Sequence, residues 1–178
     1  MVEVSNRVVL LDRDGVLNVD RSDSVTRLEE LEVQLGAPEA TQRLRDAGYR
    51  LLVITNQAVV GRGDLDPDLL HDIHQELDRR LGGTLDGFYV CPHTPDVGCA
   101  CRKPGIRLLE HARAAWPHDP VETWFVVDAE RDVEAARRAG CRPALVRTGK
   151  GRATEPAVTD VPAWDDLLAF TNWLLANP

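Results

Sequence analysis

Five short apolar runs rich in β-branched residues recur along the chain, and helical patterns separate most of them. The apolar runs cover residues 8–11, 51–54, 85–90, 124–127 and 144–146. The helical patterns cover residues 37–47, 69–81, 104–115, 131–139 and 162–176. Because strands that alternate with helices pair in parallel and carry helices on both faces, this order predicts a doubly wound α/β fold with a mainly parallel sheet.

The length of 178 residues fits a single domain, residues 1–178, with a sizeable core. Residues 16–36 directly follow the first predicted strand and are too long for a tight turn, so they form either a flap over a site or a surface excursion. Pro162 is expected to open the last helix, 162–176, which packs on the sheet. His71 and His74 lie on the helical pattern 69–81, where we expect them to be solvated and without a role.

Polar side chains follow the ends of the predicted strands. Asp12 and Asp14 follow the first strand, the segment 55–57 ends the second, and Asp128 follows the fourth. Because ligands of such sheets gather beyond the carboxyl ends of the strands, we expect these side chains to converge. The alternative for the first pair alone is an Asp-rich turn after an ordinary strand.

Three carboxylates, a hydroxyl and a lysine at one sheet edge are the parts needed to bind Mg²⁺ and transfer a phosphoryl group. Asp12 would attack phosphorus and form an aspartyl-phosphate, and Asp14 would act as general acid and base. Thr55 and Lys103 would stabilise the phosphoryl oxygens. Asp128 would complete the metal site.

Two further residues are expected to assist this site. Asp132 follows Asp128 by four residues and could orient the metal site without binding the ion. Arg102 precedes Lys103 and could hold a substrate phosphate with two parallel hydrogen bonds.

A second metal site is predicted in the loop 91–101. Cys91, His93, Cys99 and Cys101 supply three thiolates and an imidazole, which match a closed tetrahedral zinc site. With all four positions filled by protein, the zinc would be structural. The alternative is a set of scattered thiols with an incidental histidine. Cys141 stands apart and is expected to be a small buried thiol.

The net charge of −8 disfavours nucleic acid and anionic membranes as partners. A run of about 18 apolar residues, as a membrane helix needs, does not occur in the sequence. These features predict a cytoplasmic protein, and we expect it to act as a monomer on a small molecule.

Four ordered motifs together carry a specific resemblance. DRDGVLN begins at Asp12, VITNQ ends at Gln57, CRKP begins at Cys101 and VVDAERD ends at Asp132. In this order and spacing they resemble the haloacid dehalogenase superfamily of aspartate-dependent phosphatases, whose fold is Rossmann-like. The chain is most similar to the branches that act on heptose 1,7-bisphosphate, at its C7 phosphate, and on histidinol phosphate.

This resemblance implies roles for particular positions. Asp12 and Asp14 match the nucleophile and the acid/base, and Mg²⁺ would be held by Asp12, the backbone carbonyl of Asp14 and Asp128. The resemblance also implies zinc in the loop 91–101. The expected substrate contacts are Arg13, Asp20, Arg21, Ser22, Asp23, Asn56, Gln57, Ala58 and Arg102.

The choice of substrate depends on weaker signals. The segments 56–57, 61–63 and 146–151 favour the heptose branch. Val127 and Ala129 depart from the superfamily, which often has glycine and a polar or basic residue there, and residues 20–23 lack a Gly-aromatic pair common in heptose enzymes. A phosphorylated sugar is therefore the leading substrate, histidinol phosphate is the alternative, and an inactive, zinc-stabilised binding protein is the alternative from another class.

Overall fold

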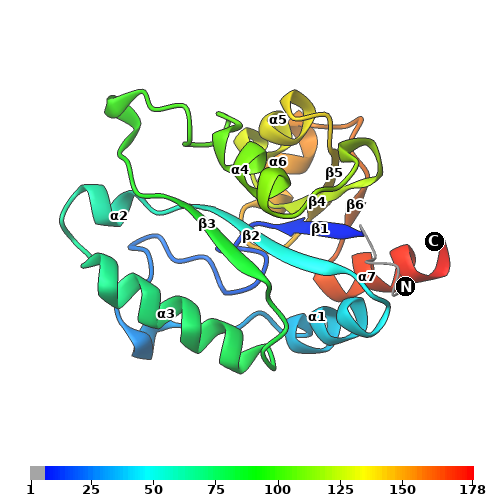
Figure 1. The fold of residues 1–178 in the computed structure, drawn as a ribbon, viewed down its shortest axis with the longest axis horizontal. Coiled ribbons are helices and arrows are strands. Elements are labelled where there is room, and N and C mark those ends of the chain that lie inside the picture. The colour runs from blue at the N-terminus through cyan, green and yellow to red at the C-terminus, as the bar shows by residue number, and fades with distance from the viewer. Residues whose placement is uncertain (1–6) are drawn as a thin grey trace.

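The computed structural model describes residues 7–178 and contains one six-stranded, fully parallel sheet with the order β3-β2-β1-β4-β5-β6 (Figure 1). The strands are β1 (Val8–Leu11), β2 (Arg50–Asn56), β3 (Gly87–Cys91), β4 (Trp124–Val127), β5 (Arg142–Val146) and β6 (Ala163–Trp164). The chain order reverses direction at β1, so β1 and its neighbours β2 and β4 form the switch point where ligands bind in such folds. The predicted doubly wound α/β fold is confirmed.

Helices cover both faces of the sheet (Figure 1). One face carries α1 (Ala37–Asp46), α3 (Pro67–Arg80) and α7 (Leu167–Ala176), and the other carries α4 (Arg107–Ala115) and α5 (Glu130–Arg138). One-turn helices α2 (Ala58–Gly61) and α6 (Gly151–Thr154) follow β2 and β5. Short 3-10 helices are η1 (Leu28–Glu30), η2 (Pro95–Val97), η3 (Pro120–Glu122) and η4 (Glu155–Ala157).

The side chains of β1 explain why its sequence shows no polar alternation. Val9 and Leu11 belong to the core that contains α1, α3 and α7 residues, while Val8 and Leu10 belong to the core that contains α4 and α5 residues. All four residues are buried. A strand that is covered on both faces must be apolar on both, and its first polar residue, Asp12, therefore marks the edge of the sheet.

The C-terminal region differs from the prediction. Ala163–Trp164 form β6 parallel to β5, and α7 begins at Leu167, capped by Asp166, whose side chain accepts a hydrogen bond of 2.8 Å from the Ala169 N–H. The predicted helix start at Pro162 was therefore wrong. The Trp164 side chain, which fits the helical period, instead packs from β6 against α7.

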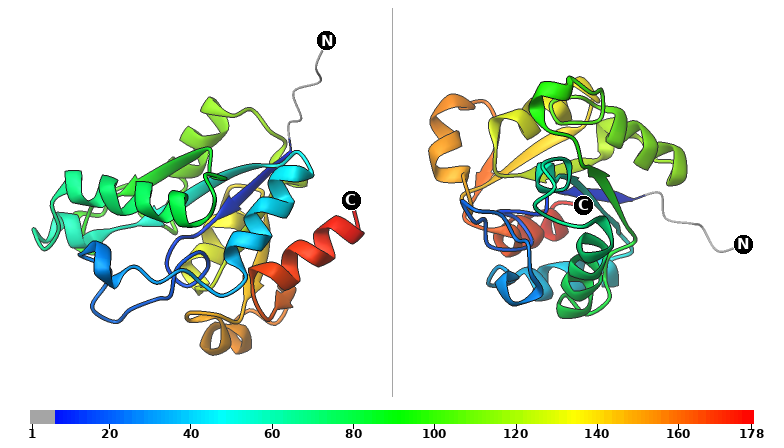
Figure 2. Two further views of the ribbon diagram at one scale, coloured as in Figure 1. Left: turned by 90° about the horizontal axis from the view of Figure 1, so that it is seen from below. Right: turned by 90° about the vertical axis from the view of Figure 1, so that its left-hand side faces the viewer.

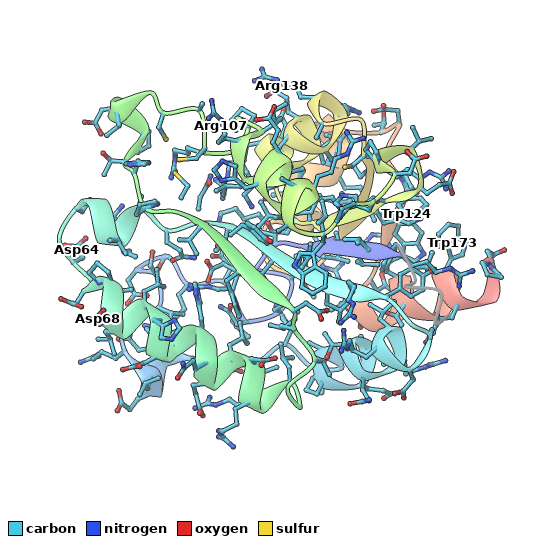
Figure 3. All side chains as sticks on the ribbon, viewed as in Figure 1. Asp64, Asp68, Arg107, Trp124, Arg138 and Trp173 are labelled. Atoms are coloured by element: carbon cyan, nitrogen blue, oxygen red, sulfur yellow. The ribbon has the colours of Figure 1, made fainter. Side chains whose placement is uncertain are left out.

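Aromatic rings join α7 to the sheet. The Trp124 ring contacts the Trp173 ring edge to face, with centroids 5.4 Å apart, and the two side chains meet where β4 faces α7 (Figure 3). The packing of α7 beside α1 closes this face of the sheet, as expected for a closing helix (Figure 2).

One other helix start differs, and two short helices were not predicted. The predicted helix 104–115 begins at Arg107 because residues 102–105 form turns, and α2 and α6 are too short to show a hydrophobic period. A single turn of helix holds too few residues for a 3.6-residue pattern to be recognised.

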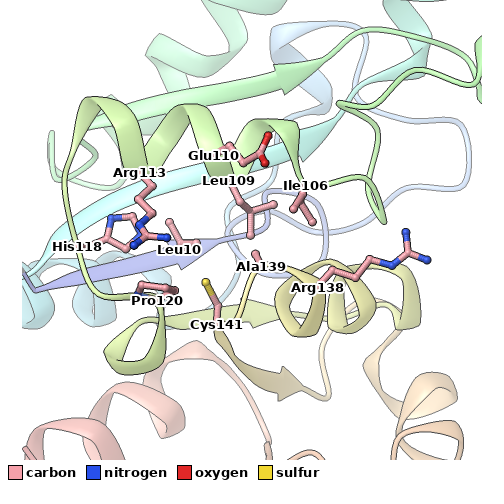
Figure 4. Close-up of a pocket in the computed structure, with 10 residues that line it drawn as sticks. All are labelled: Leu10, Ile106, Leu109, Glu110, Arg113, His118, Pro120, Arg138, Ala139 and Cys141. Carbon is pink, nitrogen blue, oxygen red and sulfur yellow. The ribbon is translucent and has the colours of Figure 1, made fainter.

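A cavity of about 140 Å³ lies between α4 and α5, away from the carboxyl ends of the strands (Figure 4). Leu10, Leu109 and Cys141 are among the residues that line it. Cys141 is buried, as predicted, and burial raises the pKa of its thiol to about 11, so the thiol stays protonated at neutral pH. Cys141 is therefore a structural thiol and not a nucleophile.

Within residues 7–178, none of the helices has both the length and the apolar character needed to cross a membrane.

Candidate active site

The carboxyl ends of β1 and β4 bring Asp12 and Asp128 together at the switch point of the sheet. Two glycines permit this approach: Gly15 has φ +86° and Gly149 has φ +56°, and a Cβ atom at either position would collide with Oδ2 of Asp128. Both are backbone conformations that favour glycine. Gly15 in the first motif thus lets the chain turn closely around the Asp128 carboxylate.

Lys103 reaches Asp12 from the loop after β3. Its Nζ donates to Oδ1 of Asp12 at 2.9 Å and to the Ile54 carbonyl at 2.9 Å, and it lies 3.1 Å from Oδ1 of Asp132. Burial and the neighbouring Asp132 raise the pKa of Asp12 to about 7, against the opposing effect of Lys103. Lys103 is only 2 % exposed, so its ammonium interacts with buried groups of the site and not with solvent.

Three carboxylates could hold a cation here. One oxygen each from Asp12, Asp128 and Asp132 lies within 4.8 Å of the others, and all three residues are buried. Neither carboxylate oxygen of Asp132 has a hydrogen-bond partner among the described residues, and burial together with Asp12 raises the pKa of Asp128 to about 7. A buried oxygen set with excess negative charge fits Mg²⁺, which prefers oxygen ligands.

Asp14 is turned away from this cluster. Its Oδ1 accepts hydrogen bonds from Arg13 at 2.8 Å and Asn18 at 2.9 Å, and its Oδ2 accepts one from Gln57 at 2.8 Å. Burial alone would raise the pKa of Asp14, but the Arg13 guanidinium and these hydrogen bonds outweigh it and hold the pKa below its usual range. Asp14 therefore has a fixed position beside Asp12.

Arg13 and His74 differ from the expectations. Arg13 is completely buried, and its guanidinium lies 3.1 Å from Nε2 of His74, so its side chain supports Asp14 from inside and lines neither cavity of the site. His74 is 5 % exposed rather than solvated, and its ring stacks on Phe88 at 4.3 Å. Burial first, and then the Arg13 charge, lower the pKa of His74 to about 3, so the ring is neutral and Nε2 accepts from Arg13.

The second strand end supplies amides and a hydroxyl. Oγ1 of Thr55 accepts a hydrogen bond of 2.8 Å from Gln57, and both residues are buried. The Asn56 side chain clamps the backbone of Lys103 through hydrogen bonds of 3.0 and 3.2 Å. These residues, which the sequence predicts as phosphate or substrate contacts, thus also hold Asp14 and Lys103 in place.

Two adjoining cavities open beside these groups. The catalytic cavity, of about 390 Å³, is lined by Asp12, Asp14, Asp20, Arg21, Ser22, Ser24, Asn56, Arg131 and Lys150. The side cavity, of about 160 Å³, is lined by Asp14, Asp20, Ser24, Asn56, Gln57, Ala58, Val59, Arg62, Arg102 and Arg131. Most predicted substrate contacts line one of them, but Arg13 and Asp23 line neither; the Asp23 carboxylate pairs with Arg21 at 2.8 Å.

Sequence reasoning missed Ser24, Val59, Arg62, Arg131 and Lys150 as cavity residues. A signal was present for three of them, because Arg131 belongs to the fourth motif, Arg62 to the segment 61–63 and Lys150 to the segment 146–151. Lys150 joins the site to residues 16–36: its Nζ contacts the Asp20 carboxylate at 2.6 Å, and its N–H donates to Oδ2 of Asp128 at 2.9 Å.

The four predicted zinc ligands lie together after β3. Sγ of Cys101 is 3.2 Å from Sγ of Cys91, 3.3 Å from Sγ of Cys99 and 3.2 Å from Nδ1 of His93. Three sulfur atoms and one ring nitrogen at these separations are the donor set of a tetrahedral zinc site. Arg102 follows directly and donates from its guanidinium to the His93 carbonyl at 3.2 Å, so this loop positions Arg102.

Comparison with known proteins agrees with this geometry. The Hydrolase_like family of HAD-type hydrolases matches residues 100–168. The D-glycero-beta-D-manno-heptose-1,7-bisphosphate 7-phosphatase of Pseudomonas aeruginosa is 39% identical over 177 residues, which cover 97% of this chain and 99% of the relative. The enzyme of the same name from Neisseria meningitidis is 36% identical and covers 95% of each chain. The chain belongs to the heptose-bisphosphate phosphatase family of HAD-type hydrolases.

Solved structures of the same family share the fold. The D,D-heptose 1,7-bisphosphate phosphatase of Bordetella bronchiseptica, complexed with magnesium and phosphate, superposes with a TM-score of 0.92 at 35% identity and covers 97% of this chain and 99% of that chain. The corresponding enzyme from Burkholderia thailandensis gives a TM-score of 0.74 at 32% identity, over 96% of this chain and 99% of that chain. Membership in the heptose-bisphosphate phosphatase family makes this chain a phosphomonoester hydrolase, as the motifs predict.

Proposed function

We propose that the protein removes the C7 phosphate of D-glycero-D-manno-heptose 1,7-bisphosphate by forming an aspartyl-phosphate on Asp12. The observation that carries this proposal is the placement of Asp12, Asp14 and Lys103 beside a cavity that adjoins a second, arginine-lined one. The names of the relatives from Pseudomonas aeruginosa and Bordetella bronchiseptica support the same substrate. Two adjoining cavities would accommodate the two phosphate groups of such a substrate.

Asp12 has one oxygen available for attack. Its Oδ1 accepts hydrogen bonds from the Arg13 N–H at 2.8 Å and from Lys103 at 2.9 Å, whereas no hydrogen bond is formed by Oδ2 to the described residues. Oδ2 would attack phosphorus as the bond from phosphorus to the sugar oxygen breaks. Lys103 and Thr55 would stabilise the negative charge on the phosphoryl oxygens during this step.

Asp14 would transfer protons in both steps. It would give a proton to the departing sugar oxygen and later take one from the water that attacks the aspartyl-phosphate. Oδ2 of Asp14 accepts one hydrogen bond, of 2.8 Å from Gln57, so a second lone pair on that oxygen can carry the proton. The lowered pKa of Asp14 suits the second step, and the negative charge of an arriving phosphate favours protonation for the first.

We propose that Asp12, Asp128 and the backbone carbonyl of Asp14 bind Mg²⁺. The support is the buried cluster of three carboxylates, which the single buried ammonium of Lys103 does not neutralise, and the magnesium present in the Bordetella bronchiseptica structure. When bound, Mg²⁺ reduces the repulsion between the phosphate and the Asp12 carboxylate. Asp132 would orient Lys103 from 3.1 Å rather than bind the ion.

We also propose that Cys91, His93, Cys99 and Cys101 bind a structural Zn²⁺. Their compact arrangement supports this, and a filled donor set leaves no position for a catalytic water. The zinc would fix the loop that carries Arg102 and Lys103.

The remaining proposals concern organisation. Residues 16–36 would act as a flap within a single domain 1–178, because Asp20, Arg21 and Ser22 of that segment line the catalytic cavity. We propose that the protein acts as a monomer on a small molecule. The four cysteines form no disulfide with one another, which suits the cytoplasm.

A phosphate-release screen tests the proposed function. It compares both anomers of heptose 1,7-bisphosphate, histidinol phosphate and a set of nucleotides, with Mg²⁺ present and Asp12→Asn as the inactive control. We expect a heptose bisphosphate to give the highest kcat/KM. A higher value for histidinol phosphate would overturn the substrate but keep the aspartate mechanism, and absence of phosphate release from every substrate would overturn the enzyme function.

A further inference from the structure

Arg131 is the cationic residue that lines both cavities of the site. The residues shared by the two cavities are Asp14, Asp20, Ser24, Asn56 and Arg131. Arg131 lies in the first turn of α5, three residues after Asp128, and its side chain is 41% exposed. Its guanidinium therefore borders the space where the transferred phosphate would lie and the neighbouring arginine-lined space.

The hydrogen-bonding groups of Arg131 are free. Within residues 7–178 its guanidinium makes no hydrogen bond, and its ion-pair contact with Asp132 is 3.7 Å long. The other cavity cations each contact a partner in the protein: the pairs are Arg21–Asp23, Lys150–Asp20, Arg62–Asp64 and Arg102–His93. An arginine with five unused donors at the boundary of a polar cavity is suited to grip an oxyanion bidentately.

Carboxylates of Asp12, Asp20, Asp128 and Asp132 surround Arg131 and raise its pKa against the effect of burial. The side cavity beyond it is lined by two further guanidiniums, those of Arg62 and Arg102. Three guanidiniums around about 160 Å³ favour an anion there. Arg131 is the member of this group that also faces the reacting phosphate.

We propose that Arg131 is a specificity-determining residue that binds the phosphate remaining on the sugar, together with Arg102. This inference rests on the proposed function and adds to it the residue that ties the two phosphate positions together. The contact would be the same before and during bond cleavage, because this second phosphate does not react. Its loss should therefore raise KM with little change in kcat.

Steady-state kinetics of Arg131→Ala and Arg131→Lys test the proposal. For the preferred heptose bisphosphate, we expect Arg131→Ala to lower kcat/KM by about 10- to 100-fold, mainly through KM. The loss for the corresponding heptose 7-phosphate should be at least about ten times smaller, since it lacks the second phosphate. Arg131→Lys should recover part of the loss, because a lysine keeps the charge but not the two parallel hydrogen bonds.

A matched control is Arg107→Ala. Arg107 lies on α4 outside both cavities, is exposed and pairs with Glu110 at 3.5 Å (Figure 3). Its removal should leave both substrates unaffected. Thermal melting of all variants should show unchanged Tm, which separates a binding role from a structural one.

The double variant Arg102→Ala, Arg131→Ala adds a readout of shared binding. If the two residues grip one phosphate, the fold-loss of the double variant differs from the product of the two single losses. A product within about twofold would overturn the shared contact. Equal losses for bisphosphate and monophosphate in Arg131→Ala, or no loss, would also overturn the proposal.

A separate measurement distinguishes failure of the proposed function from failure of the Arg131 proposal. If the wild-type enzyme releases no phosphate from heptose bisphosphates, the proposed function is wrong, and fructose 1,6-bisphosphate with fructose 6-phosphate then serves as the substrate pair for the Arg131 variants. A selective loss for the bisphosphate in that pair supports Arg131, and its absence overturns the inference.

Discussion

Lys103 donates a hydrogen bond of 2.9 Å to Oδ1 of Asp12, although 91 residues separate them and both are almost completely buried. The same ammonium lies 3.1 Å from Asp132. A buried lysine that contacts two carboxylates is stable only because both compensate its charge. One cation thus holds together the end of β1, the start of α5 and the loop after the zinc ligands.

Asp12→Asn tests covalent catalysis. The amide keeps the shape of the carboxylate but is a poor nucleophile, so turnover should fall to background while the fold persists, with Lys103 still compensated by Asp132. Phosphate release and a thermal melt measure the two effects. Near-normal turnover by the purified variant would rule out attack by Asp12. Asp14→Asn should instead slow release of phosphate from the intermediate more than its formation.

Zinc as a structural ion predicts a loss of stability on chelation. Removing zinc should lower Tm by about 4–8 °C and then reduce activity, because a loss of about 2 kcal/mol shifts Tm by roughly 2–4 °C per kcal/mol in a protein of this size. Added Mg²⁺ should restore neither.

The matched variants for zinc are Cys99→Ser with Cys101→Ser, and Cys141→Ser as the control. Cys141 is buried outside the cluster, so its change should not affect zinc content. Elemental analysis that finds no zinc in protein purified without chelator, or an unchanged Tm in the double variant, would contradict the assignment.

The sequence predicts more of the fold than of the buried contacts that support the site. The run 8–11 marks β1 because a strand covered on both faces has no polar residues, and Asp12 then marks the sheet edge. At the C-terminus, the spacing of Trp164 and Leu167 fits a helix, and it is the backbone pairing of residues 163–164 with β5 that makes them the strand β6.

Contacts between segments that are distant in the sequence limit what could be predicted about the site. The helical period already places His74 on the buried face of α3 and His71 outside it, but the partner of His74, Arg13, lies 61 residues away and no local pattern identifies it. Arg13 illustrates the same limit: its place in the first motif suggests a substrate contact, but its side chain is completely buried between Asp14 and His74. Arg131 lines both cavities because it lies in the first turn of α5, and the local sequence does not show how that helix is oriented toward the site.

His74 predicts a pH dependence of stability. Its pKa is about 3 in the folded protein and lies near 6.5 when unfolded, so between these values the unfolded chain binds more protons. The contribution of neutral His74 to the free energy of unfolding is fully present above pH about 6.5 and is lost as the pH falls toward 3. Over this range the free energy of unfolding changes by at most about 1.4 kcal/mol per pH unit.

Urea unfolding between pH 4 and pH 7 measures this effect. His74→Gln keeps an acceptor for Arg13 but cannot be protonated, so its free energy of unfolding should fall less on acidification than that of the wild type. His71→Gln, on the exposed side of the same helix, should behave like the wild type. Parallel pH curves for wild type and His74→Gln would show that His74 is not held neutral.

The position of Arg102 predicts that the enzyme prefers bisphosphate substrates to monophosphates. It lines the side cavity, and its own loop anchors it through the His93 carbonyl. If it grips the phosphate that stays on the sugar, the bisphosphate is preferred over the monophosphate by about 1.5–3 kcal/mol, or roughly ten- to a hundredfold in kcat/KM. Arg102→Ala should strongly reduce that preference, and hydrolysis of a small generic phosphate ester should fall far less, since that ester has no second phosphate to lose.

The two substrates separate the possible roles of Arg102. Equal damage to the bisphosphate and to the generic ester would mean that Arg102 serves the reacting phosphate itself. Zinc removal provides an independent check, because the loop that carries the zinc ligands also fixes Arg102. Chelated enzyme should therefore lose preference for the bisphosphate before it loses hydrolysis of the generic ester, and loss of both activities in parallel would show that the loop supports catalysis rather than specificity.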